Sequence, residues 1–204
     1  MKVVDLTHPI SENTPVYPGD PMVQIKTSSE IGKDGYADHL VSFGTHVGTH
    51  MDAPAHMIPG GKKLGQFPIE KFVGSGTLID VSKKKQIDNT SISNVKIREG
   101  DIVLFYTGWD SKYLDSQYFT EYPLLTESLA RELVTKKVKI VGTDTCSPDK
   151  APFSVHKILL GNEILIIENL TNLQKLTNKN FIVYALPLAS NLDGAQTRAI
   201  AVYE

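Results

Sequence analysis

Short apolar runs rich in Val, Ile and Tyr recur along the whole chain, and residues that favour turns separate them. Runs of this length and composition are typical of β-strands that pack into a core. The predicted strands are Lys2–Leu6, Met22–Thr27, Leu40–Phe43, Thr77–Val81, Ile102–Thr107, Lys139–Gly142, Ile164–Ile167, Phe181–Leu186 and Ala199–Tyr203.

Helical periodicity is confined to two segments. Thr126 is a suitable N-cap for a helix over Glu127–Lys136, in which Leu129 and Leu133 fall on one face. A shorter helical turn is expected over Val155–Leu160. Because strands outnumber helices, the pattern predicts an α/β fold, a compact mixed β-sheet with few helices, and not a regular βαβ repeat.

Composition and charge narrow the class of protein. A chain of 204 residues with 41% hydrophobic residues fits one domain, residues 1–204, whose core needs no disulfide or metal. The net charge of -2 gives no basic field to attract nucleic acid or a membrane surface. Cys146 is the only cysteine, and the first residues contain no secretory signal. We therefore expect a cytoplasmic protein that binds a small-molecule substrate.

The segment from His46 to His56 concentrates the reactive side chains. Three of the six histidines, His46, His50 and His56, lie here together with Asp52. Imidazole and carboxylate groups are the usual nitrogen and oxygen ligands of zinc and similar ions. The segment therefore predicts a metal site, whereas an isolated histidine would indicate only a hydrogen bond.

The spacing of these residues requires a bend in the backbone. In a straight strand His46 and His50 would be roughly 13 Å apart, at about 3.3 Å per residue, which is too far to share one ion. A helix is disfavoured by the glycines and by the β-branched residues between them. We expect an irregular loop after Leu40–Phe43, with Gly48 supplying the bend.

The run H-V-G-T-H-M-D-A-P-A-H over residues 46–56 resembles the H-x-G-T-H-x-D-x-P-x-H signature of the cyclase family, which includes bacterial kynurenine formamidases and isatin hydrolases. The segments 5–11, 17–20 and 193–198 are similar to the opening strand, an early turn and the closing segment of that family. The resemblance implies a swivelling β/β/α-like domain that forms a homo-oligomer, either a dimer or a tetramer.

The resemblance also implies which residues bind metal. His46, His50 and Asp52 would bind a first ion, and Glu168 would complete it. His156 would bind a second ion that Asp52 and Glu168 bridge. The expected ion is Zn²⁺, with Mn²⁺ as the alternative and with one or two ions per chain.

The implied activity is that of a metal-dependent amidohydrolase resembling arylformamidase, which converts N-formylkynurenine to kynurenine and formate in tryptophan catabolism. A metal-activated hydroxide would attack the carbonyl carbon. His56 would act as the acid/base, since a pKa near 6.5 suits proton transfer in both directions. Tyr17 stands where kynurenine formamidases generally carry a tryptophan, so it would line the substrate site as an aromatic wall.

Three alternatives remain open from the residues. The substrate could be another cyclic amide, imide or lactone, as in isatin hydrolases, or the protein could bind metal without catalysis. Cys146 could act as a nucleophile, although no pattern places a histidine beside it. Otherwise the loop Asp144–Asp149 is expected to shape the pocket, with Asp144 as its polar contributor.

Overall fold

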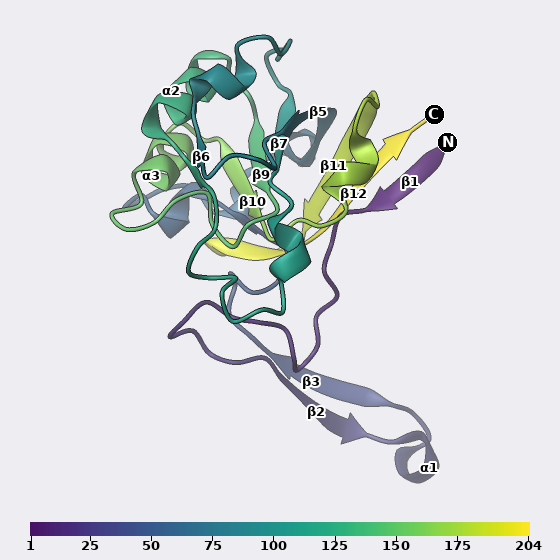
Figure 1. Cartoon of the computed structure of the whole chain (residues 1–204). Coiled ribbons are helices and arrows are strands. Elements are labelled where there is room, and N and C mark those ends of the chain that lie inside the picture. The colour runs from purple at the N-terminus through teal and green to yellow at the C-terminus, as the bar shows by residue number, and fades with distance from the viewer.

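The computed structural model describes residues 1–204 and is built on one eight-stranded sheet. The sheet has the order β1-β12-β11-β5-β7-β9-β10-β4, and β12 also pairs with β4, so seven of its strands close into a barrel (Figure 1). The strands are β1 (Lys2–Asp5), β4 (His50–Asp52), β5 (Val73–Asp80), β7 (Ile102–Tyr106), β9 (Ile140–Thr143), β10 (Leu165–Glu168), β11 (Phe181–Pro187) and β12 (Gly194–Tyr203).

The remaining elements are short and lie around this sheet. Two further strand pairs are β2 (Gln24–Ser29) with β3 (Asp38–Ser42) and β6 (Gln86–Ile87) with β8 (Leu124–Leu125). The α-helices are α1 (Ile31–Asp34), α2 (Glu127–Thr135) and α3 (Ser154–Gly161). The 3-10 helices are η1 (Pro54–His56), η2 (Leu64–Gln66), η3 (Ile69–Phe72), η4 (Asn89–Ile92), η5 (Trp109–Lys112) and η6 (Leu173–Leu176).

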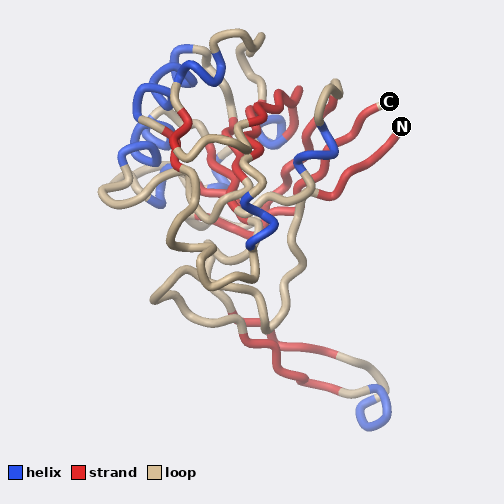
Figure 2. The backbone as a smooth tube through the Cα atoms, in the orientation of Figure 1, coloured by secondary structure: helices blue, strands red, loops and turns tan.

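Alternate residues of the central strands belong to two different cores. In β7, Ile102 and Leu104 join the core shared by β4, β10, β11 and β12, whereas Val103 and Phe105 join the core that includes Leu129 of α2. Both faces of these strands are therefore buried, which explains why the sequence shows continuous apolar runs here and no alternation. The helices α2 and α3 lie together on one side of the sheet (Figure 2).

The hairpin of β2 and β3 projects away from the barrel as an arm (Figure 1). We use the word arm for residues 24–42, none of which is buried. Ile31, Tyr36, Leu40 and Val41 are all exposed large hydrophobic residues on it. An isolated two-stranded hairpin is marginally stable in water, so the arm depends on contacts outside its own two strands.

The fold confirms the predicted α/β class, and every predicted strand overlaps an observed one. Three strands begin earlier than predicted: β3 at Asp38, β5 at Val73 and β12 at Gly194. In β5 and β12 the ladder pairing with Tyr184 and Asp52 continues through glycines that the sequence pattern excludes. The expected helices are also present, as α2 and α3. None of the helices combines the length and the apolar character needed to span a bilayer.

One expectation is wrong in part. Residues 50–52 form the strand β4, although we expected an irregular loop over the whole histidine segment. The strand exists because backbone groups of β10 and of β12 pair with it on its two sides. Such long-range pairing leaves no local signal in a three-residue segment. The bend itself is where it was expected, since Gly48 has a φ of 65°.

Candidate metal and catalytic site

Strand β4 fixes the direction of the reactive side chains. Met51 is fully buried in the barrel core, so His50 and Asp52, on either side of it, point to the opposite face. In the register of β4 with β10, His50 lies directly opposite Glu168. Cross-strand partners have Cβ atoms about 4.5–5.5 Å apart, so the ladder alone brings these two side chains together.

A turn before β4 brings His46 back to the same place. With Gly48 in the left-handed region, the rings of His46 and His50 stand 5.2 Å apart between their centroids, far closer than a straight strand would allow. Gln196 of β12 holds this turn, because its side-chain amide donates to the carbonyl oxygen of Gly44 at 2.8 Å. The bend therefore brings the rings of the two histidines close together, as their spacing in the sequence required.

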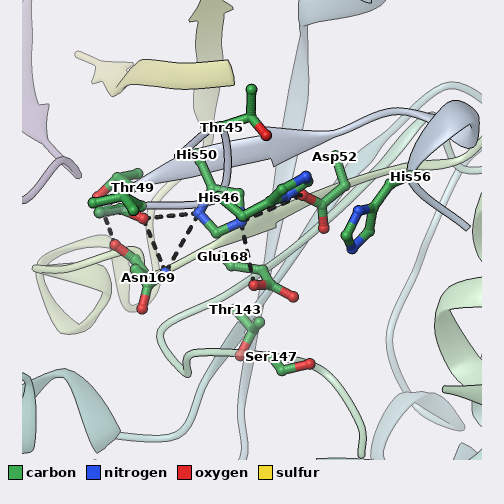
Figure 3. Close-up of polar contacts among 12 residues, drawn as sticks. Thr45, His46, Thr49, His50, Asp52, His56, Thr143, Ser147, Glu168 and Asn169 are labelled. Atoms are coloured by element: carbon green, nitrogen blue, oxygen red, sulfur yellow. Dashed lines mark hydrogen bonds and ion pairs between the residues drawn. The ribbon is translucent and has the colours of Figure 1, made fainter. Parts of the chain in front are cut away.

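The environment of His50 fits a divalent cation. Its Nδ1 is 2.8 Å from the carbonyl oxygen of Gly48, so this nitrogen carries the proton and donates it. Its Nε2 lies 3.3 Å from both Asp52 Oδ1 and Glu168 Oε2 (Figure 3). Yet His50 Nε2 and Asp52 Oδ2 are buried without a hydrogen-bond partner. Buried polar atoms rarely lack partners, and a cation between these three side chains would supply one.

The charged forms of His50 and Asp52 stabilise each other. Burial alone would lower the pKa of His50, but the carboxylates of Asp52 and Glu168 raise that pKa to about 10. Burial opposes ionisation of Asp52 as well, yet the neighbouring histidines, His50 first among them, hold its pKa well below the usual range. In the metal-free protein a proton on His50 therefore takes the place of the cation.

His46 and His56 form the outer rim of the site. The Nδ1 of His46 is 2.7 Å from Asp52 Oδ1, and its Nε2 is 2.9 Å from Asp193 Oδ2. His56 sits in η1 with its ring centroid 3.9 Å from that of His46, and its Nδ1 is 3.7 Å from Asp193 Oδ2. Burial is the main reason that the pKa of His56 is lowered. Its imidazole is therefore neutral at pH 7 and able to accept a proton.

His156 reaches the site from helix α3. Its Nε2 lies 3.2 Å from Glu168 Oε1 and 3.6 Å from Asp52 Oδ2. On the other side of the ring, Nδ1 is 2.6 Å from Asp149 Oδ1. The structure thus brings together all five residues that the resemblance assigned to metal, and it places Nε2 of His156 against the carboxylates of both Asp52 and Glu168.

Two sets of side chains converge closely enough to hold an ion. The ligand atoms of His50, Asp52 and Glu168 all lie within 4.8 Å of one another, and so do those of His46, Asp52 and His56. The geometry allows His56 to act as a ligand as well as an acid/base.

A cavity of about 240 Å³ opens over these groups. Tyr17, Phe119, Phe153 and Met57 form its apolar wall, and His46, His56, His156 and Glu168 lie at its polar end. Tyr17, expected as the aromatic wall, lines this cavity and contacts Phe119 edge to face at 5.8 Å between ring centroids. An apolar wall with a few converging polar groups is typical of a small-molecule site.

The loop Asp144–Asp149 shapes this cavity as expected, through Cys146 and Ser147, but the expectation for Asp144 is wrong. Asp144 is fully buried away from the cavity and accepts hydrogen bonds from the backbone of Thr107 and Gly108, so it anchors the loop after β7. The thiol of Cys146 donates to the carbonyl oxygen of Tyr118, and burial raises its pKa. A protonated thiol is a poor nucleophile, which disfavours the covalent mechanism.

Comparison with known proteins identifies the family. The family model described as "Putative cyclase" matches residues 4–150. The chain belongs to the cyclase family. Among its relatives is a kynurenine formamidase of Bacillus cereus, 27% identical over 97% of this chain and 95% of that protein.

Two solved structures are similar to this chain over nearly their whole length. A potential metal-dependent hydrolase with cyclase activity is 31% identical, with a TM-score of 0.84 over 98% of this chain and 96% of the other. An isatin hydrolase bound to the product analogue thioisatinate is 26% identical, with a TM-score of 0.90 over 100% and 93%. The expected enzyme class, a hydrolase, and the expected divalent metal agree with these relatives.

Sequence reasoning missed three polar residues of the site. Asp193 was part of the family-like closing segment but had no assigned role, and Asp149 lies seven residues before the histidine that it contacts. Asn169, next to Glu168, donates to the carbonyl oxygen of Gly48 at 2.9 Å. A hydrogen-bonding residue of this kind has no fixed spacing from its partner, so no sequence pattern identifies it.

Proposed function

We propose that this member of the cyclase family is a divalent-metal-dependent amidohydrolase that cleaves a small aromatic amide, with N-formylkynurenine as the first candidate. The observation that carries the proposal is the pair of unpartnered buried atoms, His50 Nε2 and Asp52 Oδ2. They lie 3.3 Å from Glu168 Oε2 and 3.6 Å from His156 Nε2, respectively, directly behind the polar end of an aromatic cavity that Glu168 and His156 line. The B. cereus relative named kynurenine formamidase supports the choice of substrate.

In this proposal His46, His50, Asp52 and Glu168 would hold a first ion, and His156, together with the carboxylates of Asp52 and Glu168, would hold a second. A divalent cation bound there would lower the pKa of a water molecule towards about 7 and would polarise the substrate carbonyl. Zn²⁺ suits the mixed nitrogen and oxygen ligands, and Mn²⁺ is the alternative to compare.

The protein side chains have separate roles around the reacting carbonyl. His56 borders the cavity and is neutral, so it takes the proton of the attacking water at an imidazole nitrogen and passes it to the leaving nitrogen. Asp193, near both His46 and His56, keeps the two rings oriented. Tyr17 and the other aromatic side chains of the wall stack on the planar part of the substrate.

A second candidate substrate is a cyclic amide of the isatin kind. It is favoured by the extent of the structural similarity to the isatin hydrolase, and the same site would open the ring. In a third reading, the chain binds metal without catalysis, and His56 would then serve only as a ligand together with His46 and Asp52.

The test is to incubate the protein, freed of metal and then reloaded with Zn²⁺ or Mn²⁺, with N-formylkynurenine and with isatin. We expect hydrolysis of at least one of the two, dependent on the added ion and abolished by a chelator. Turnover of isatin alone would move the assignment to the second candidate. Tight binding of either ion without turnover of any amide or ester would contradict the proposed function.

The chain is further proposed to work as a homo-oligomer in the cytoplasm. The arm supports the oligomer, because its exposed apolar residues would be covered by a second copy of the chain. Light scattering of the protein and of a variant shortened at the arm measures this directly. We expect the wild type to have at least twice the mass of one chain and the shortened variant to lose that association.

A further inference from the structure

The two histidines at the centre of the site are held by different kinds of acceptor. His50 donates its Nδ1 proton to the backbone carbonyl oxygen of Gly48 at 2.8 Å, whereas the Nδ1 of His156 faces the Oδ1 of Asp149 at 2.6 Å. In both rings the Nε2 is thereby left facing the carboxylates of Asp52 and Glu168. Only His156 is therefore held at Nδ1 by a side chain, which a substitution can change.

From this difference we infer that Asp149 is a positioning residue that fixes the Nδ1–H tautomer of His156 and so governs whether the second ion binds. A carboxylate behind a metal-bound imidazole fixes the ring and strengthens it as a ligand. The inference rests on the metal-dependent function proposed above, and it assigns a role to a residue that has no contact with the ion itself.

The second oxygen of Asp149 has a separate partner, which fixes the carboxylate. Its Oδ2 accepts the backbone N–H of Val155 at 2.7 Å and that of His156 at 3.3 Å, in the first turn of α3. These two groups would otherwise lack partners at the start of the helix. Tyr122 adds to the anchoring, since its hydroxyl donates to the carbonyl oxygen of Asp149 at 2.9 Å. Asp149 itself is only 6% exposed, so water does not compete for its oxygens.

This arrangement lets one substitution separate capping from tautomer control. In Asp149→Asn the side chain has one acceptor and one donor group. The backbone N–H groups of Val155 and His156 can only donate, so they select the amide oxygen. The NH₂ group is then left facing the His156 ring and donates to Nδ1. The ring proton must move to Nε2, which can no longer bind a cation.

The experiment measures zinc binding by titration calorimetry and by metal analysis, in the absence of substrate. Wild type should bind two ions, and Asp149→Asn should bind the second at least tenfold more weakly while the first changes less than threefold. Asp149→Ala offers no donor to Nδ1, so it should weaken the second ion less than Asp149→Asn does, and it should also lower the Tm, because the helix loses its cap. A matched control is Thr126→Ala, which removes the side-chain cap of α2 from Leu129 and should lower the Tm without changing zinc binding.

A measurement on the wild-type protein tests the tautomer of His156 even if the variants misfold. Long-range ¹H–¹⁵N spectra of the zinc-loaded protein should show the proton of His156 on Nδ1. Coordination through Nδ1, a single zinc ion in the wild type, or unchanged binding of both ions by Asp149→Asn would each overturn the inference. A protein that binds zinc as described but hydrolyses nothing would contradict the proposed function and leave this inference standing.

Discussion

The arm and the segment that follows it are adjacent in the sequence, but they differ in how far the rest of the fold buries them. Residues 24–42 contain no buried residue, whereas residues 47–54 are all buried, and residues 50–52 among them pair with two strands of the barrel. Both regions carry polar residues among apolar ones, and each contains histidine. The difference is that β4 is enclosed by β10 and β12, while β2 and β3 pair only with each other.

This contrast shows what makes a histidine reactive in this protein. His39 in the arm is exposed, and Thr27 lies directly opposite it across the hairpin. His50 is 1% exposed and lies between two carboxylates that raise its pKa to about 10. The same imidazole group is thus an exposed surface residue in one region and a buried group between two carboxylates in the next.

The largest expected effect is a loss of activity, and it distinguishes a histidine of the site from a histidine of the arm. His56→Ala should lower kcat by about 10²–10⁴, the usual contribution of a general acid/base, and should keep zinc binding by the other ligands. The matched control, His39→Ala, changes a histidine in the arm and should leave kcat within a factor of two. Full activity of His56→Ala in a steady-state assay would refute the role assigned to His56.

A smaller effect is expected when the packing behind a ligand is changed. A Cβ atom at Gly194 would stand 2.6 Å from Cε1 of His46, so Gly194→Ala must displace that ring. We expect zinc affinity and kcat/KM to fall by about 10- to 100-fold, as for other residues that support ligands. Gly44→Ala is the control, since its Cβ would meet only Val47 at an ordinary 3.7 Å. Unchanged zinc affinity in Gly194→Ala would show that His46 is not a ligand.

The coupled charges predict a pH dependence for the metal-free protein. The pKa of His50 is raised from 6.5 to about 10 in the folded state, so this group stabilises the fold fully below pH 6.5. That contribution is lost as the pH rises through about 10. The Tm of the chelated protein should therefore fall between pH 7 and 10. Zinc should reverse the trend, because the cation replaces the proton and binds more tightly as the pH rises. A chelated protein whose Tm rises over this range would contradict the charge arrangement described for the site.

Much of this fold was predictable because its signals are local. The continuous apolar run of β7 and the capped, amphipathic pattern of α2 each identify an element from a few adjacent residues. The cluster from His46 to His56 was likewise identifiable by composition and by its resemblance to a family signature.

The sequence could not predict the features that depend on distant pairing. The strand β4 exists through its ladders to β10 and β12, and Asp149 acquires its importance only when α3 brings His156 beside it. Nor did the sequence indicate that the predicted strands at residues 22–27 and 40–43 form an exposed arm. A run of apolar and polar residues specifies an extended segment, but only the rest of the fold decides whether that segment is covered.

The smallest effect is expected in the arm. Leu40 is already 62% exposed, so Leu40→Lys should change the unfolding free energy of the isolated chain by less than about 0.5 kcal/mol. The same change should reduce the mass in light scattering, because a charge in an apolar contact between two copies disfavours their association. Leu114→Lys is the control: Leu114 is 78% exposed, lies outside the arm, and its substitution should alter neither quantity. If Leu40→Lys leaves the mass unchanged, the arm is not the contact between copies. If instead it destabilises the diluted chain by 2 kcal/mol or more, Leu40 packs within its own chain, and the contrast between the exposed arm and the enclosed strand β4 would have to be given up.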